Sequence, residues 1–221
     1  MFAIFYKLFH SHLSIMRFQN HLKIQNLIAI FLIFFGIFSI TYSFLFRTID
    51  ELFWFCYIGL IITGIGILKQ NKNLILSQIN LLAIPSFLWI FDFIAILLTK
   101  KSFFNLATYF FSPEFSIIEK VISLEHLFLV PIGLFFLLII KPKTKQKLSK
   151  NSWIISLTEA TLIFIILKII YLTTNLPKNI NCVNHSCFNN FSPVYYPLMW
   201  ITSMFAIILL TDFLLNNLDK K

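Results

Sequence analysis

Residues 27–46 read LIAIFLIFFGIFSITYSFLF, a run of twenty residues without a charged side chain. Because an α-helix rises 1.5 Å per residue, about 20 apolar residues are enough to cross the ~30 Å hydrocarbon core of a bilayer. The run shows no alternation of apolar and polar residues, which a strand of a membrane barrel would need. This segment therefore predicts a transmembrane helix.

Five further apolar segments of similar length follow along the chain. The second segment is the shortest, and the third is interrupted by Pro85. Another apolar stretch, Phe103–Phe111, is too short to span, and we expect it to be interfacial or re-entrant. We predict an all-α integral membrane bundle of about six transmembrane helices within residues 27–216, with spans at Leu27–Phe46, Leu52–Leu68, Leu74–Leu98, Val121–Ile140, Trp153–Thr173 and Val194–Leu215.

The composition points the same way. Of the 221 residues, 58% are hydrophobic and only 12% are charged, and the mean hydropathy is +0.84. Soluble domains carry about 25% charged residues. A soluble fold of this size would lack the polar residues to cover its surface, so the lipid bilayer is the expected surrounding.

The basic residues predict an orientation, because cytoplasmic loops of membrane proteins are enriched in Lys and Arg. If the six segments alternate in direction, twelve of the 18 basic residues fall on the side that carries both chain ends and residues 141–150, and five fall on the other side. We therefore expect the N-terminal residues 1–26 and the tail 217–221 to be cytoplasmic, and the protein to lie in the inner cell membrane. This bias also explains the net charge of +9. Since the sequence shows no exposed face of basic and aromatic residues, nucleic-acid binding is not expected.

The N-terminal segment has no small-residue cleavage site after a compact apolar region, so we expect no cleaved signal peptide. Its apolar residues recur at roughly helical spacing, with basic residues between them. This pattern predicts an amphipathic helix on the inner membrane surface, and a frayed tail is the alternative. The apolar residues are Phe2, Phe5, Phe9, Leu13 and Met16.

The chain has three cysteines. Cys56 lies in a span, where a cysteine usually packs as a small apolar residue. Cys182 and Cys187 enclose the stretch CVNHSC in the last external loop. A disulfide between these two, free thiols, or a metal site with His185 are the alternatives, and the metal reading is the weakest because a fourth ligand is missing.

Ionisable side chains inside spans are costly and mark the place to look for function. Counted from the span ends at 1.5 Å per residue, Asp92, His126 and Lys168 share the outer half of the membrane. Glu159 and Asp212 lie toward the cytoplasmic half, and a structural or interfacial role is expected for both. Glu125 precedes His126 directly.

Polar and small residues follow one face of the fourth segment, and this face predicts a groove or a contact with another helix. We predict that His126 on this face and Asp92 form an acid/base pair or bind a metal, opening to the outside beneath the last external loop. The alternative is a buried hydrogen-bond network that fixes the helix register, in which Lys168 neutralises Asp92 or Glu125. The residues of the face are Ser116, Glu119, Ser123, His126 and Gly133.

Three short motifs stand out along the chain: a W-x-x-D-F segment at 89–93, an S-L-x-H helix with a following proline at 123–131, and a loop containing N-I-N-x-V at 173–183. Together they resemble an uncharacterised family of small bacterial multi-pass membrane proteins. The resemblance covers about residues 75–215 and implies a topology but no reaction. The positions that it singles out are Asp92, His126, Asn179 and Asn181.

The chain departs from the family pattern at two positions. Cys182 stands where the family tends to have Trp, and Asp212 stands where a His near the end of the last helix is expected. If that His served a metal site or a proton relay, the same activity is in doubt for this chain.

The leading hypothesis for function is a membrane-embedded enzyme acting on a lipid or lipid-linked substrate. Asp92 and His126 would be catalytic, and Asn179, Asn181 and Lys168 would bind the substrate. The alternatives are a small transporter or channel, and a non-catalytic membrane scaffold in which glycines of the second segment allow close helix packing. The chain contains none of the common hydrolase, zinc-protease or nucleotide-binding motifs, and the sequence assigns neither a cofactor nor metal ligands.

Overall fold

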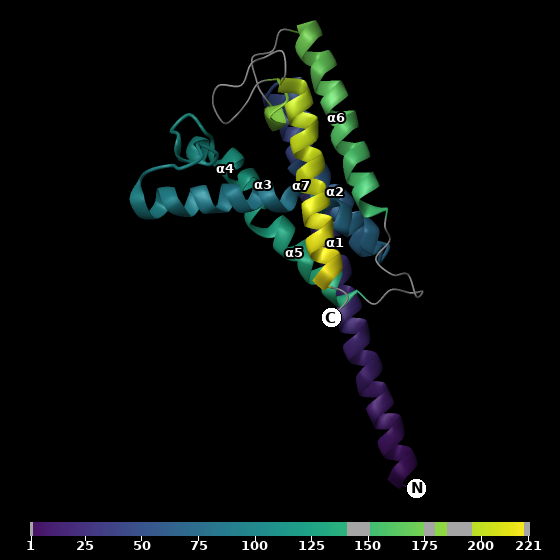
Figure 1. Ribbon diagram of the computed structural model, residues 1–221. Helices are drawn as coiled ribbons and strands as arrows, with labels where there is room; N and C mark the ends of the chain where they lie inside the picture. Colours follow the sequence, from purple (N-terminus) through teal and green to yellow (C-terminus); the bar gives the residue numbers. More distant parts are fainter. Residues whose placement is uncertain (1, 141–150, 175–179, 185–195, 219–221) are drawn as a thin grey trace.

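A computed structural model describes residues 2–140, 151–174, 180–184 and 196–218, with side chains described from residue 22 to residue 215 within these ranges (Figure 1). All regular structure in this part of the chain is helical. The α-helices are α1 (Phe2–Phe46), α2 (Phe55–Leu68), α3 (Lys72–Thr99), α4 (Ile117–Ser123), α5 (Glu125–Ile139), α6 (Ser152–Thr174) and α7 (Tyr196–Leu218), and the short 3-10 helices are η1 (Ile49–Phe53), η2 (Thr108–Phe111) and η3 (Ile180–Cys182).

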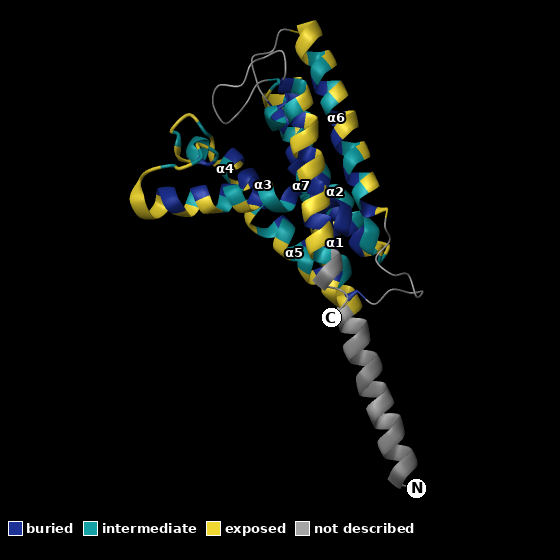
Figure 2. Ribbon diagram, viewed as in Figure 1, coloured by how far each residue is buried: buried dark blue, intermediate teal, exposed yellow. Residues whose placement is uncertain are grey.

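Six helical stretches in the described residues are long and apolar enough to cross a membrane, which confirms the predicted all-α bundle. They run over Leu22–Phe46, Ile49–Leu68, Lys72–Thr99, Ile117–Ile139, Ser152–Thr174 and Tyr196–Leu215. Many of the exposed residues are large and apolar. Exposed residues lie mainly on the outer sides of the helices, and buried residues lie toward the interior (Figure 2). Since such a surface suits hydrocarbon and not water, the chain is a multi-pass membrane protein.

The beginning of α1 and the end of α7 lie at the same end of the bundle (Figure 1), as an even number of spans requires. The N-terminal residues continue α1 as a helix from Phe2. The cytoplasmic location of this end and the identity of the membrane remain predictions.

Glycines of α2 allow the helix to lie close to its neighbours. A methyl group added to Gly64 would lie 2.7 Å from the carbonyl oxygen of Ala29 on α1, and one added to Gly66 would lie 2.9 Å from Ile75 on α3. A methyl group added to Gly59 would likewise lie within 3 Å of a side-chain carbon of Leu82 on α3. The close packing expected for these glycines therefore occurs inside the bundle, between α2 and the helices α1 and α3.

Helix α3 lies across the bundle and contacts α2, α5, α6 and α7, while its C-terminal part extends out to one side (Figure 1). In its N-terminal half, buried amides bind carboxylates of the last two spans. Gln78 donates to Glu159 on α6 at 2.6 Å, and Asn80 donates to Asp212 on α7 at 2.9 Å. Ser152 donates to the same Asp212 oxygen at 2.6 Å. These bonds join α3, α6 and α7, in agreement with the structural role expected for the two acidic residues.

The fourth predicted span, Val121–Ile140, is not one helix. It begins earlier, at α4, and is interrupted at Leu124 before α5 starts. Ser116 and Glu119 form a capping box at the start of α4, which explains why this helix begins in front of the apolar run. Pro131 lies inside α5 and Pro85 lies inside α3, and neither ends its helix.

The stretch Phe103–Phe111 forms an irregular loop and η2 that fold back on the C-terminal half of α3 (Figure 1). The ring of Phe93 lies 5.0 Å from that of Phe110 and 5.4 Å from that of Phe111. Aromatic contacts thus attach this segment to the side of the bundle, and it contains no span.

Candidate functional site

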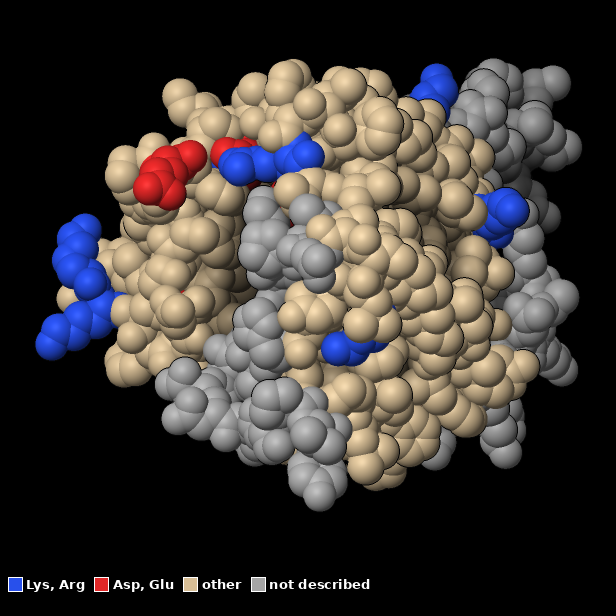
Figure 3. Space-filling model, turned by 90° about the horizontal axis from the view of Figure 1, so that it is seen from above, with Lys and Arg blue, Asp and Glu red and all other residues tan. Residues whose placement is uncertain are grey.

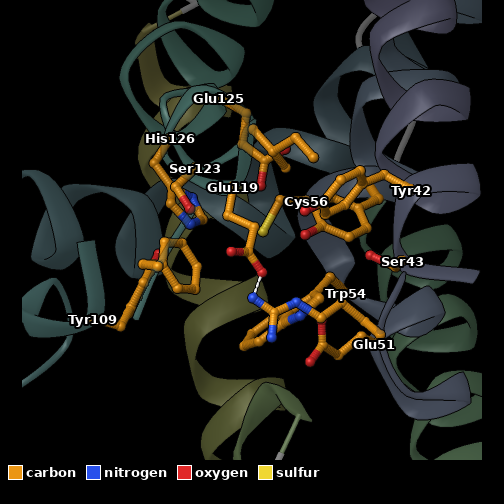
Figure 4. A pocket seen from close by; sticks show the side chains of 14 residues that line it. Tyr42, Ser43, Glu51, Trp54, Cys56, Tyr109, Glu119, Ser123, Glu125 and His126 are labelled. Atoms are coloured by element: carbon orange, nitrogen blue, oxygen red, sulfur yellow. Dashed lines mark ion pairs between the residues drawn. The ribbon is translucent and has the colours of Figure 1, made fainter. Parts of the chain in front are cut away.

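A cavity of about 170 Å³ lies at the end of the bundle away from the start of α1 (Figure 4). The end of α1, η1, the start of α2, η2, α4 and the start of α5 contribute side chains to it. By the predicted orientation this is the outer end. Figure 3 shows this end from above as a largely uncharged face, with one place where basic and acidic side chains meet.

Cys56, Glu125 and His126 form the chemical centre of the cavity. One side-chain ligand atom of each residue lies within 4.8 Å of the other two. Cys56 is the second residue of α2, while Glu125 and His126 open α5. Cys56 and Glu125 are buried, and the Oε2 atom of Glu125 has no hydrogen-bond partner among the described residues.

His126 is held from the side by aromatic residues. Its ring lies 4.8 Å from the ring of Trp89, and the indole N–H of Trp89 donates to the hydroxyl of Tyr109 at 2.8 Å. Burial raises the pKa of Tyr109, so its hydroxyl keeps its proton at neutral pH. Tyr109 itself lines the cavity and presents a neutral hydroxyl near the imidazole.

An ion pair lies at the edge of the cavity, between Arg47 and Glu119, and the dashed line in Figure 4 marks it. Glu119 also accepts a bond from the backbone N–H of Ser116 at 2.7 Å, so the capping box fixes the carboxylate. The Arg47 guanidinium lies 5.9 Å from the centre of the Phe115 ring. The side chain of Arg47 remains 30% exposed, which leaves a cation accessible at the entrance.

Asp92 does not line this cavity, although the sequence paired it with His126. Its buried carboxylate instead binds the loop that follows α3, and each of its oxygens accepts several hydrogen bonds of 2.7–3.0 Å. This arrangement stabilises the loop and leaves the carboxylate no place in proton transfer with His126. The donors are the hydroxyl of Ser102 and the backbone N–H groups of Phe103, Phe104, Leu106 and Ala107.

The residues expected to bind substrate also lie outside the cavity. The side-chain amide of Asn181 donates to the carbonyl of Phe53 at 2.7 Å and accepts from the N–H of Phe55 at 3.3 Å, so it anchors η3 to the start of α2. Lys168 extends over the rings of Phe164 and Tyr171 on α6. Their proposed contacts with substrate remain predictions without support from the geometry.

Two further expectations involve residues outside the described part of the chain. One is the predicted role of Asn179 in binding the substrate, because Asn179 lies outside the described residues. Cys182 is disulfide-bonded, and Cys187, which the sequence predicts as its partner, lies outside the described residues.

Comparisons with family models, curated proteins and solved structures find no match to this chain. The resemblance to small bacterial multi-pass proteins therefore stays a prediction.

The sequence located part of this site. Glu119, Ser123 and His126, which share the polar face of the fourth segment, all line the cavity, so the expected groove exists. Cys56 and Arg47 were missed as site residues. A single cysteine in an apolar helix gives no signal by itself, whereas the adjacent acidic residue and histidine at 125–126 could have indicated the site.

Proposed function

We propose that the protein is a membrane-embedded enzyme that acts on a lipid or lipid-linked substrate at the outer membrane surface. The observation that carries the proposal is the buried, unpaired carboxylate oxygen of Glu125 beside His126 in a cavity. An unsatisfied buried acceptor costs about 1–3 kcal/mol or more. Asp50 and Glu159 also have buried oxygens without a hydrogen-bond partner among the described residues, but neither lines the cavity, whereas Glu125 does.

The side chains of the cavity supply the parts of a hydrolytic or transfer reaction. His126 is placed to take a proton from water or from a substrate hydroxyl, and Glu125 can accept a second hydrogen bond or neutralise the charge that forms. Arg47 at the edge offers a guanidinium to an anionic group, and phosphate is the group that such a fork binds best. The substrate's polar part would therefore lie between Arg47 and His126.

The hydrogen bonds of the inner half favour an enzyme over a transporter. Glu159 is bound by Gln78, and Asp212 is bound within the bundle as well. A transporter needs a continuous polar path, whereas each of these two carboxylates is engaged by at least one hydrogen bond from a neighbouring helix.

The proposal is tested with the full chain reconstituted in vesicles of phosphatidylglycerol and phosphatidylethanolamine. We expect the wild-type chain to release or transfer a head group, detected by mass spectrometry of the lipid and water phases. His126→Ala and Glu125→Gln should lower the rate by about 100-fold or more, because each removes a group that handles protons.

Lys168→Met is the matched control, since Lys168 is ionisable and lies in a span but away from the cavity. This variant should keep the wild-type rate. Turnover that survives in His126→Ala and Glu125→Gln would contradict the proposed site. No change in either lipid would contradict the proposed reaction and favour the scaffold alternative.

A further inference from the structure

We infer that Cys56, Glu125 and His126 bind a single zinc ion, with one coordination position left open toward the cavity. Binding of the ion is argued from the three side chains alone. Its part in turnover rests on the proposed function: with zinc bound, the ion would lower the pKa of a bound water or hydroxyl, and His126 and Glu125 would hold the ion in place of accepting the proton themselves.

The distances suit a metal site. A tetrahedral zinc ion with ligand bonds of about 2.0–2.3 Å holds its ligand atoms about 3–4 Å apart. The three candidate ligand atoms already lie within 4.8 Å of one another. Shifts of about an ångström, within the reach of side-chain rotations, would complete the site. Figure 4 shows the Cys56 sulfur and the Glu125 carboxyl in the same part of the cavity, with His126 on its other side.

The kinds of donor atom select the metal. A thiolate, an imidazole and a carboxylate together suit zinc, whereas calcium and magnesium prefer oxygen ligands only. Three protein ligands with one open position are typical of catalytic zinc, and structural zinc sites usually have four. Glu119, the nearest further acid on the polar face, is bound by Arg47 and by the Ser116 N–H, so it is not available as a fourth ligand.

The charge of a zinc ion would balance the charges of its ligands. Glu125 is only 2% exposed and Cys56 only 6%, and both lie in helical stretches that are long and apolar enough to span the membrane. Without a metal both groups would stay protonated, because two buried anions without a counter-charge would be very costly there. A zinc ion with a carboxylate and a thiolate gives a neutral set, and it also satisfies the unpaired Oε2 atom of Glu125. Among the groups that face these residues, Arg47 is a cation, but its guanidinium is paired with Glu119.

The surroundings of His126 fit the orientation that a metal ligand needs. Packing of its ring on Trp89 fixes the plane of the imidazole, and the bond from Trp89 to Tyr109 in turn fixes the indole. Ligands held in place by such neighbours bind metals more tightly than mobile ones. The open position would then face the hydroxyl of Tyr109 and the entrance at Arg47, where water or a substrate oxygen could bind.

The test measures the metal content of the full-length chain, purified in detergent, stripped with a chelator and reloaded with zinc chloride. We expect about one zinc ion per chain, measured by inductively coupled plasma mass spectrometry after unbound metal has been removed. Reloading with cobalt should give the near-ultraviolet absorption of a thiolate bound to cobalt.

Cys56→Ser, Glu125→Gln and His126→Ala should each lower the zinc content about tenfold or more at micromolar free zinc. Cys56→Ser should also abolish the thiolate band of the cobalt form. Glu125→Gln keeps the size and shape of the side chain, so its loss of metal would not be due to a failure to fold, and circular dichroism of each variant checks this.

His185→Ala is the control for metal captured by the CVNHSC stretch, and it should keep both the zinc and the cobalt band. A wild-type chain without zinc, or zinc that only His185→Ala removes, would overturn the inference. Zinc binding without lipid turnover would leave the inference standing and contradict the proposed function. Turnover that chelators do not affect, in a chain that carries no zinc, would overturn the inference and leave the proposed function standing.

Discussion

At the scale of single residues, the carboxylate of Asp92 accepts hydrogen bonds from four backbone N–H groups between residues 103 and 107. That segment is irregular, and it follows directly on a transmembrane helix. Irregular backbone close to hydrocarbon survives only where its polar groups are satisfied by the protein. Asp92 therefore replaces the hydrogen bonds that a helix would have supplied.

Replacing Asp92 with Asn should destabilise this loop. The amide nitrogen of Asn cannot accept a hydrogen bond, so the N–H groups of Leu106 and Ala107, which bind the same carboxylate oxygen, would lose their acceptor. We expect a loss of about 3 kcal/mol and faster hydrogen exchange at residues 103–107. Thermal unfolding in detergent and exchange measured by mass spectrometry check this.

Asp50→Asn is the matched control for Asp92→Asn. Asp50 is also buried, but neither of its carboxylate oxygens has a hydrogen-bond partner among the described residues. Its replacement should leave the melting temperature unchanged or raise it. Equal destabilisation by the two variants would mean that the bonds to the loop do not explain the role of Asp92.

The limits of prediction at this scale follow from geometry. Counting residues from a span's end gives the depth of Asp92, His126 and Lys168, and that depth placed all three in one half of the membrane. Depth does not give the direction in which a side chain points around its helix, and direction decides which of them meet. His126 was placed correctly beside a groove because neighbours on the same face supplied that direction, whereas Asp92 and Lys168 had no such pattern.

At the scale of helices, the ends of the spans could be predicted closely. The first and second spans were expected to end at Phe46 and Leu68, where α1 and α2 do end. The interruption at Leu124 was missed, because it is one residue wide in an apolar run and hydrophobicity averages over it. The capping box of Ser116 and Glu119 was visible in the sequence and could have located the start of α4.

The contact between α1 and α2 depends on Gly64. A methyl group there would lie 2.7 Å from the carbonyl oxygen of Ala29 and 2.6 Å from a side-chain carbon of Ile33. Gly64→Ala should therefore separate the two helices and cost about 1–3 kcal/mol. Because Cys56 lies on α2, we also expect a lower zinc content in this variant.

Gly133→Ala is the comparison for Gly64→Ala, measured by thermal unfolding in the same detergent. Its new methyl group would lie 3.3 Å from a side-chain carbon of Ile79, which can move aside. We expect a smaller loss of stability than for Gly64→Ala. The reverse order would show that backbone proximity does not limit the packing of α2.

At the scale of the whole molecule, the cavity and the predicted cytoplasmic side lie at opposite ends of the bundle. The assignment of substrates to the outer leaflet depends on this orientation, which the distribution of basic residues predicts. An inverted protein would present the same cavity to the cytoplasm and to the inner leaflet.

Orientation can be measured with single cysteines in a background that carries Cys56→Ser, Cys182→Ser and Cys187→Ser, which removes all three native cysteines. A membrane-impermeant maleimide applied to intact cells should label Glu114→Cys, in the exposed segment before α4, but not Lys145→Cys, in the basic loop 141–150. Labelling of both after the cells are opened is the positive control. The opposite pattern in intact cells would place the cavity on the inner side.

The hydrogen bonds of Asp92 also bear on the order in which the protein assembles during synthesis. They join residues only 10 to 15 positions apart, so α3 and its loop can complete them as soon as residue 107 has emerged. The cavity has to wait, because its centre joins the start of α2 to the start of α5. Local contacts form faster than distant ones. Helix α3 and its loop would thus fold first, and the newly made α4 and α5 would then pack against them. Glu125 would contact Cys56 only after that step.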